Sequence, residues 1–160
     1  AGIAREYVIR DGAQWYAVLG TDRVEAQIGA YAYPGPLRDR LVAAIATGEK
    51  TATASLFDDY QRSGEPLPEV GDVEVVVDSQ DRPICVTRNI RVRVERFGDV
   101  PDEHAVAEGE GCADAAAWRQ VHRDFWTSPE FVADMGEPAI AVDDDIRVVL
   151  VEMQVVARVG

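Results

Sequence analysis

The sequence predicts an α+β fold in which the strands form a mixed β-barrel with helices inserted between them. Two long β-rich runs, Arg82–Phe97 and Ile146–Val159, and a shorter run, Val73–Asp78, supply the strands. Helical segments fall between these runs without a strict strand–helix–strand rhythm, which argues against a doubly wound sheet. A chain of 160 residues is most simply one domain with a substantial hydrophobic core.

The first 32 residues carry the weakest local pattern. The stretch REYVIRDGAQWYAVLG is compatible with a helix but is interrupted by Gly12. We therefore expect residues 1–32 to form an N-terminal extension, helical and packed on the domain, and residues 33–160 to form the domain itself.

A helix is expected over the stretch LRDRLVAAIATG. Leu37, Leu41 and Ile45 recur at helical spacing, and Gly48 stands where the C-cap of a helix belongs. This segment ends two residues before Lys50.

The next stretch, TATASLF, changes to a period of two, so Thr51, Thr53 and Ser55 share one face of a predicted strand. One interpretation is an ordinary half-buried strand, on which β-branched Thr is common. The other is a hydroxyl-lined face that looks into a cleft. Spacing alone favours the ordinary strand.

Two further helices are expected between the long β-runs. In DVPDEHAVAEG, Asp99 is placed as the cap, and His104 and Glu108 stand four residues apart and so on one face.

Asp114 is placed as the cap of the second of these helices. Trp118, Val121, His122 and Phe125 are expected on its inner face.

The charge of the chain limits its partners. A net charge of −13 argues against broad, charge-driven binding to duplex DNA or to anionic membranes. No apolar run approaches the roughly 18 residues of a membrane span. Two cysteines without a CxxC pair form no disulfide framework, so a reduced cytoplasmic setting is expected.

Familiar catalytic and cofactor motifs do not occur. His104, Glu108, Cys112 and His122 match no standard zinc spacing, so no metal or cofactor is expected. The chain has no GxSxG, P-loop or GxGxxG motif, and Cys85 stands in the middle of a predicted strand, as a small apolar residue does.

Lys50 is the only lysine, whereas fifteen arginines supply the remaining positive charge. An amine can lose its proton or act as a compact point charge, and a guanidinium does neither well. A hydroxyl such as that of Thr53 becomes a nucleophile when a neighbouring group removes its proton. A nearby glutamate can relay that proton. These residue types suit acyl transfer, although their spacing alone is weak support.

Three separated stretches resemble the ASCH domain family, whose fold is a PUA-like β-barrel. They are LRDRLVAAIATGEKTATASL, GEPLPEVGD and FGDVPDEHAVAEGEG followed by WRQVHRDFW, and they occur in the order expected for that family. The resemblance covers about residues 33–157.

The resemblance implies an association with RNA and its modifications, and small bacterial members are N(4)-acetylcytidine amidohydrolases. Their catalytic Lys, Thr and Glu correspond to Lys50, Thr53 and Glu108, because the small enzymes also carry a histidine four residues before the glutamate, as His104 stands here. Glu110 is an alternative to Glu108, since both flank the same turn.

The resemblance is incomplete, which affects the expected substrate more than the expected fold. This chain is longer than the small amidohydrolases, and its EGEG turn and WRxxH helix are typical of a different branch of the family. Contacts to the substrate are expected from eight residues: Thr51, Ser55, Tyr60, Arg88, His104, Glu110, Trp118 and His122.

Two other functions remain open on the sequence, namely an RNA-binding module without catalysis and a single-strand ribonuclease that uses the same cleft. In the RNA-binding case, Lys50, Arg38, Arg40 and Arg88 would contact phosphates, and Trp118 or Tyr60 would stack on a base. The expected ligand is therefore a small nucleoside or a short single-stranded RNA.

Overall fold

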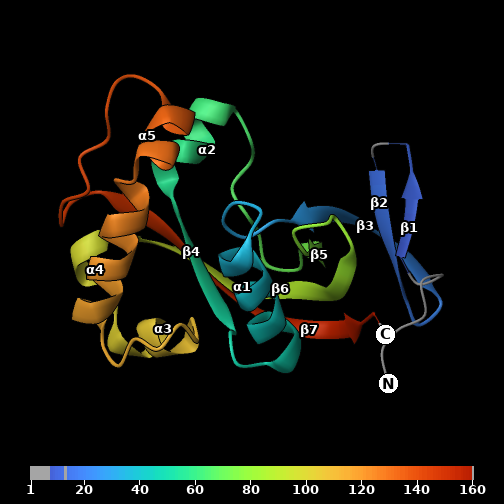
Figure 1. Cartoon of the computed structure of the whole chain (residues 1–160). Coiled ribbons are helices and arrows are strands. Elements are labelled where there is room, and N and C mark those ends of the chain that lie inside the picture. Colours follow the sequence, from blue (N-terminus) through green and yellow to red (C-terminus); the bar gives the residue numbers. More distant parts are fainter. Residues whose placement is uncertain (1–7, 13, 160) are drawn as a thin grey trace. The chain divides into compact units, whose positions relative to one another are not determined.

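A computed structural model describes residues 8–12 and 14–159 of the chain, which form two compact units. Among the described residues, the first unit contains those up to residue 51 together with 69–91 and 152–159, and the second contains residues 52–68 and 92–151. Figure 1 shows the ribbon coloured along the sequence.

Strands rather than a helix occupy most of the N-terminal segment. Strands β1 (Val8–Asp11), β2 (Gln14–Leu19) and β3 (Asp22–Gly29) pair antiparallel in succession, and β3 pairs parallel with β5 (Val73–Val77). The helical expectation for residues 1–32 is therefore wrong wherever the structure describes them. A domain boundary at residue 32 stays a prediction.

The segment forms strands because its apolar residues alternate with a period of two, and a glycine allows the chain to turn between one strand and the next. Trp15, Ala17 and Leu19 lie on one face of β2 and pack into a cluster that includes Val73 and Val75 of β5. Gly20 has a left-handed φ of 68° at the turn between β2 and β3, which a residue with a Cβ atom adopts less readily.

The helix α1 (Pro36–Thr47) confirms the expectation for its segment. Gly48 is its C-cap in the left-handed conformation, and the Gly48 N–H donates to the Ile45 carbonyl at 3.1 Å. Val42 and Ile45 of α1 pack on a cluster that includes Val76 of β5 and Met153. The first unit is therefore a sheet with one helix packed on it.

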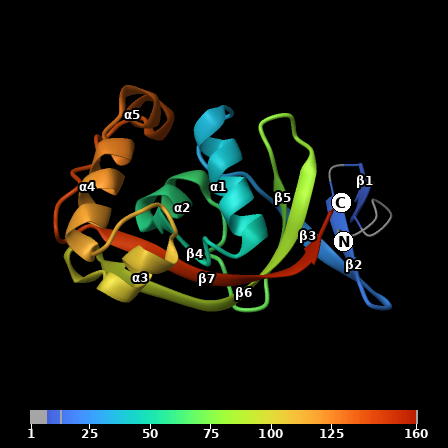
Figure 2. The same ribbon diagram turned by 60° about the horizontal axis from the view of Figure 1, so that its bottom comes forward.

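The second unit gathers most of the helices. It contains β4 (Ala52–Leu56), α2 (Phe57–Ser63), η2 (Phe97–Asp99), α3 (Asp102–Ala107), α4 (Ala115–Trp126) and α5 (Pro129–Met135). Its core is largely aromatic, because Phe97, Trp118 and Trp126 pack together with Leu56 and Leu150. Figure 2 shows α3, α4 and α5 in this unit.

Two details of these helices differ from expectation. The residue before α3 is Pro101 rather than Asp99, since Asp99 ends a separate short turn, η2. Val121 is 44% exposed, whereas Trp118 and Trp126 are buried. The face of α4 that packs on the core contains Trp118, His122 and Trp126, which are spaced four residues apart. Val121 precedes His122 by one residue, so its side chain points away from that face.

Asp114 caps α4 as expected, because its carboxylate accepts a hydrogen bond from the Ala117 N–H at 2.9 Å.

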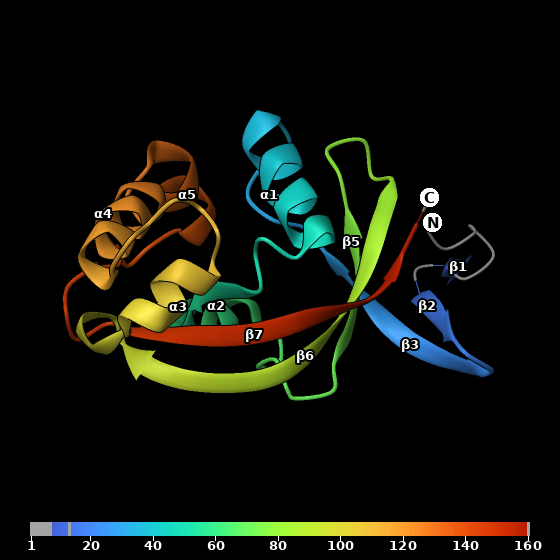
Figure 3. The ribbon, with the colours of Figure 1, turned by 90° about the horizontal axis from the view of Figure 1, so that it is seen from below.

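The strands β6 (Pro83–Arg96) and β7 (Arg147–Arg158) are the predicted long β-runs and lie side by side (Figure 3). The order across the sheet is β1-β2-β3-β5-β6-β7-β4. The α+β class is thus confirmed. For the described residues, β1 and β4 are two separate ends of this order, so the expected barrel is not closed.

None of the helices formed by the described residues has the length and apolar content needed to cross a membrane.

Candidate functional site

The carboxylate of Glu108 is the centre of a buried polar cluster in the second unit. Glu108 follows the last turn of α3 and is 1% exposed. Its Oε2 lies 2.6 Å from Trp118 Nε1 and 2.6 Å from His104 Nε2. A buried carboxylate is costly unless charged or hydrogen-bonding partners surround it, and here the partners are in place.

Local sequence explains why these side chains meet. His104 and Glu108 are four residues apart on α3, so their side chains stack along one face of the helix. Gly109 and Gly111 then adopt left-handed φ values of 66° and 86°, which let the chain turn sharply toward α4. Asp102 of α3 accepts a hydrogen bond from the Ala115 N–H at 2.8 Å and so ties the start of α4 to α3.

His122 completes the cluster from the next turn of α4. Its ring stacks on Trp118 with centroids 4.1 Å apart, and its Nδ1 lies 3.0 Å from the Trp118 carbonyl oxygen. Its Nε2 lies 3.1 Å from Glu108 Oε1. Both oxygens of the Glu108 carboxyl group therefore have nitrogen partners. Because the His122 side chain is 12% exposed and that of Glu108 only 1%, His122 is the more accessible member of the pair.

Glu110 lies close to this pair. A carboxylate oxygen of Glu108, a carboxylate oxygen of Glu110 and a ring nitrogen of His122 are all within 4.8 Å of one another. At this spacing the three atoms could ligate one cation. His104 and Cys112 are not in this group. His104 Nε2 is instead directed at Glu108.

The other candidate residues of the second unit lie on β4 and α2. Ser55 Oγ and the Tyr60 hydroxyl are 2.7 Å apart, so these two predicted binding residues do meet. Thr53 is partly buried on β4, between the buried Ala52 and the partly buried Ala54. The half-buried strand that the sequence favoured is therefore present.

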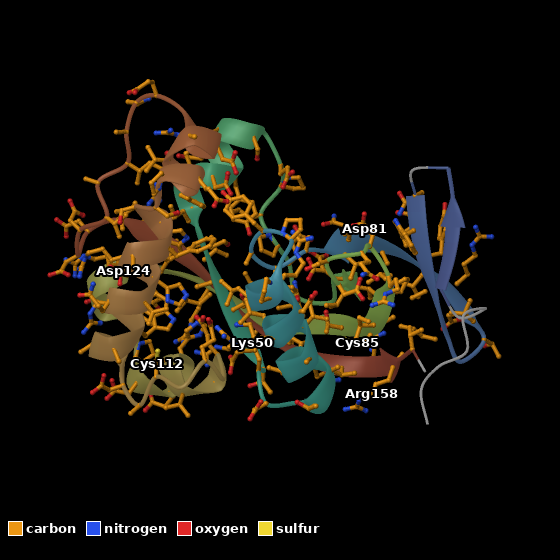
Figure 4. The ribbon with its side chains drawn as sticks, in the orientation of Figure 1. Lys50, Asp81, Cys85, Cys112, Asp124 and Arg158 are labelled. Carbon is orange, nitrogen blue, oxygen red and sulfur yellow. The ribbon has the colours of Figure 1, made fainter. Side chains whose placement is uncertain are left out.

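Lys50, Thr51 and Arg88 belong to the first unit. Lys50 follows α1 (Figure 4) and is 3% exposed, and its backbone N–H donates to the Ala44 carbonyl at 3.0 Å. Thr51 is exposed, whereas Arg88 is partly buried on β6. A lysine that is almost fully buried is uncommon, because burial of an ammonium group is unfavourable unless the group is paired or neutral.

Sequence reasoning missed Glu74, a further titratable group in an unusual environment. Burial raises the pKa of Glu74 to about 7, against a hydrogen bond from the Tyr31 hydroxyl that lowers it. Across the β5–β6 pair, Glu74 stands opposite Thr87, whose fully buried hydroxyl has no hydrogen-bond partner among the described residues. The available signal was a single carboxylate inside the apolar run VEVVV.

A groove of about 410 Å³ elsewhere in the second unit contains none of the predicted site residues. It is lined in part by Phe57, Arg62 and Arg147. The Arg62 guanidinium donates hydrogen bonds to the carbonyls of Met135 and Gly136, so it links α2 to the end of α5.

The sequence model of the ASCH domain family matches residues 29–157, and the chain therefore belongs to the ASCH domain family. ASCH domains are generally RNA-binding or RNA-related domains. No curated protein matches the sequence.

Two solved structures are similar to this chain over most of its length. The ASCH domain from Lactobacillus crispatus JV V101 is 28% identical with a TM-score of 0.72, and the match covers 82% of this chain and 80% of that one. The protein EF3133 from Enterococcus faecalis V583 is 25% identical with a TM-score of 0.74, over 86% and 80% of the two chains. The predicted family and fold class are thereby confirmed.

Proposed function

We propose that this ASCH domain hydrolyses the amide bond of an N(4)-acylated cytosine nucleoside without a metal ion, using Lys50, Thr53 and Glu108. The observation that carries the proposal is the Glu108 carboxyl group, which is buried and contacted by three ring nitrogens. It follows His104 by four residues, as the resemblance to the N(4)-acetylcytidine amidohydrolases implies.

In the proposed reaction, the Thr53 hydroxyl attacks the acyl carbon, and its proton passes to the Lys50 amine as the new C–O bond forms. The C–N bond then breaks, and the amine leaves as cytidine with a proton that Glu108 delivers. Water then attacks the acyl-threonine and the carboxylic acid departs, while the Thr53 oxygen recovers its proton from Lys50. Lys50 and Thr53 are three residues apart, so the chain itself keeps their Cα atoms within about 11 Å.

Lys50 supports this chemistry better than simple phosphate binding. Arginine binds a solvent-exposed phosphate as well as lysine does. Apart from Lys50, the lysine and arginine positions of this chain are all arginine. A buried amine instead suits a compact oxyanion or a proton-transfer step. Thr51, Ser55, Tyr60, Arg88 and Glu110 are proposed to contact the substrate.

The test is incubation of the purified full chain with N(4)-acetylcytidine in the presence of EDTA, with products separated by chromatography. Cytidine should form, and Thr53→Ala and Glu108→Gln should each lower the rate at least about a hundredfold. Thr47→Ala, which removes an exposed threonine at the end of α1, is the matched control and should keep the parent rate. Absence of cytidine above a boiled control at high protein concentration would refute the proposal.

The RNA association of ASCH domains favours a second candidate function, binding or cleavage of single-stranded RNA. Several phosphate contacts would make RNA affinity fall steeply with salt, whereas turnover of a neutral nucleoside should hardly respond. Fluorescence anisotropy with a short labelled RNA at low and moderate salt distinguishes an RNA-binding protein from a nucleoside hydrolase. A cytoplasmic location and the absence of duplex DNA and membrane partners are part of both proposals.

A further inference from the structure

The protons of the Glu108 cluster can be assigned from its contacts. The Trp118 indole N–H can only donate, so Glu108 Oε2 is its acceptor at 2.6 Å. His104 Nε2 lies 2.6 Å from the same oxygen, and the buried His104 Nδ1 has no hydrogen-bond partner among the described residues. An unpaired lone pair costs less than an unpaired buried N–H. His104 is therefore the neutral tautomer with its proton on Nε2.

The number of protons on the His122 ring differs from that on the His104 ring. Its Nδ1 faces the Trp118 carbonyl oxygen at 3.0 Å, and a carbonyl can only accept, so Nδ1 carries a proton. Its Nε2 faces Glu108 Oε1 at 3.1 Å. Without a proton on that axis, two lone pairs would oppose each other in a buried site. One further proton must therefore lie between Glu108 and His122.

Two contacts place this proton on the imidazole. Glu108 already accepts from Trp118 and His104, and hydrogen bonds donated to a carboxylate favour its ionised form. The His122 ring is stacked on the Trp118 indole at 4.1 Å with an interplanar angle of 23°, and an indole face attracts a cation. Glu110, which has a carboxylate oxygen within 4.8 Å of a His122 ring nitrogen, also favours a positive charge there.

We propose that His122 is an imidazolium ion paired with the Glu108 carboxylate, and that it stores the proton that Glu108 delivers to the leaving amine. This role rests on the proposed function, whereas the ion pair itself does not. When the C–N bond breaks, the His122 Nε2 proton passes through Glu108 Oε1 to the departing nitrogen and leaves a neutral imidazole. The proton that water releases in the second step restores the imidazolium. His122 thus acts through Glu108 as a positioning residue that also carries a proton.

The ion pair can be tested directly, because the chain has only two histidines. Long-range proton–nitrogen correlation spectra of the ¹⁵N-labelled full chain at pH 7 distinguish protonated from unprotonated ring nitrogens. His104 should show the neutral pattern with a proton on Nε2, and His122 should show two protonated nitrogens. His122→Asn assigns the signals, since it removes one of the two sets.

Variants then identify the partner of His122. Glu108→Gln should convert His122 to the neutral form with its proton on Nδ1, because the Gln amide can donate to Nε2 and no longer carries a charge. Glu103→Gln, which changes an exposed glutamate of α3 outside the cluster, is the matched control and should leave His122 doubly protonated. A neutral His122 in the parent protein, or an imidazolium that persists in Glu108→Gln, would overturn the proposal.

Kinetics test the proton-carrying role separately. His122→Gln should lower kcat for N(4)-acetylcytidine about tenfold to a hundredfold with little change in KM. A kcat within about twofold of the parent would show that His122 carries no proton for the reaction. If the parent shows no turnover but the spectra are as expected, the proposed function fails while the ion pair stands.

Discussion

Glu74→Gln should make the protein more stable at pH 8 and leave its stability almost unchanged at pH 4.5. Glu74 is partly buried on β5, and its burial raises the pKa to about 7 from an ordinary value of 4.5. Gln has the shape of the protonated acid and keeps an oxygen that can accept from the Tyr31 hydroxyl, which lies 3.3 Å from Glu74 Oε1. The substitution therefore removes the ionisation and little else.

The sign follows from proton binding. Between about pH 4.5 and 7, the folded protein holds a proton on Glu74 that the unfolded chain has released, so the stability contributed by this group falls as pH rises. The contribution is fully present below pH 4.5 and is lost above about pH 7. At about 1.4 kcal/mol for each tenfold change in the ionisation constant, the largest difference between variant and parent is about 3 kcal/mol.

The assay is urea unfolding of parent and variant between pH 4.5 and 8, followed by tryptophan fluorescence. The difference in unfolding free energy should grow with pH and level off above about pH 7, while groups distant from Glu74 cancel in the subtraction. Glu25→Gln, an exposed glutamate on β3, should give a nearly flat difference. If the Glu74→Gln difference is equally flat, burial does not raise the pKa of Glu74.

Two substitutions and one labelling experiment test other features of the structure. Lys50→Arg should keep the circular dichroism spectrum but lower nucleoside turnover at least about a hundredfold, and retention of RNA affinity with no turnover in the parent would make Lys50 a phosphate contact. Trp118→Ala should cost about 3–5 kcal/mol in urea unfolding because the indole is fully buried, and a loss below about 1 kcal/mol would contradict that burial. Burial raises the pKa of Cys85 to about 11 and also raises that of Cys112, with nearby carboxylates adding to the effect. An aromatic disulfide reagent at pH 8 should therefore label only the partly exposed Cys112 in the folded protein, slowly, and rapid release of two thiols would be inconsistent with this.

Local signals were sufficient for many elements. Helix α1 ends at Gly48 as expected, because a left-handed residue after a periodic apolar stretch is a property of a few neighbouring positions. Asp114 caps α4 for the same reason. The β-rich runs became β5, β6 and β7, since β-branched residues in alternation favour strands wherever they pair. The i, i+4 spacing placed His104 beside Glu108.

The remaining features depend on contacts that the sequence does not encode locally. Residues 14–29 lie in the N-terminal segment that the sequence predicts to be helical, yet they form β2 and β3 because Ala17 and Ala26 find apolar partners on β5 that are far away in the chain. His122 meets Glu108 only because the turn at Gly109 and Gly111 brings α4 back to α3.

Glu74 gives the same lesson for electrostatics. A carboxylate in an apolar run has no unusual acidity until the sheet takes water away from it, and the sheet is assembled from strands that are distant in sequence. The sequence by itself was sufficient to predict helices α1, α3 and α4, the long strands and the family, because short-range geometry decides those. Tertiary structure alone decided which polar groups are buried together, because desolvation and hydrogen-bond partners arise only when separate segments pack.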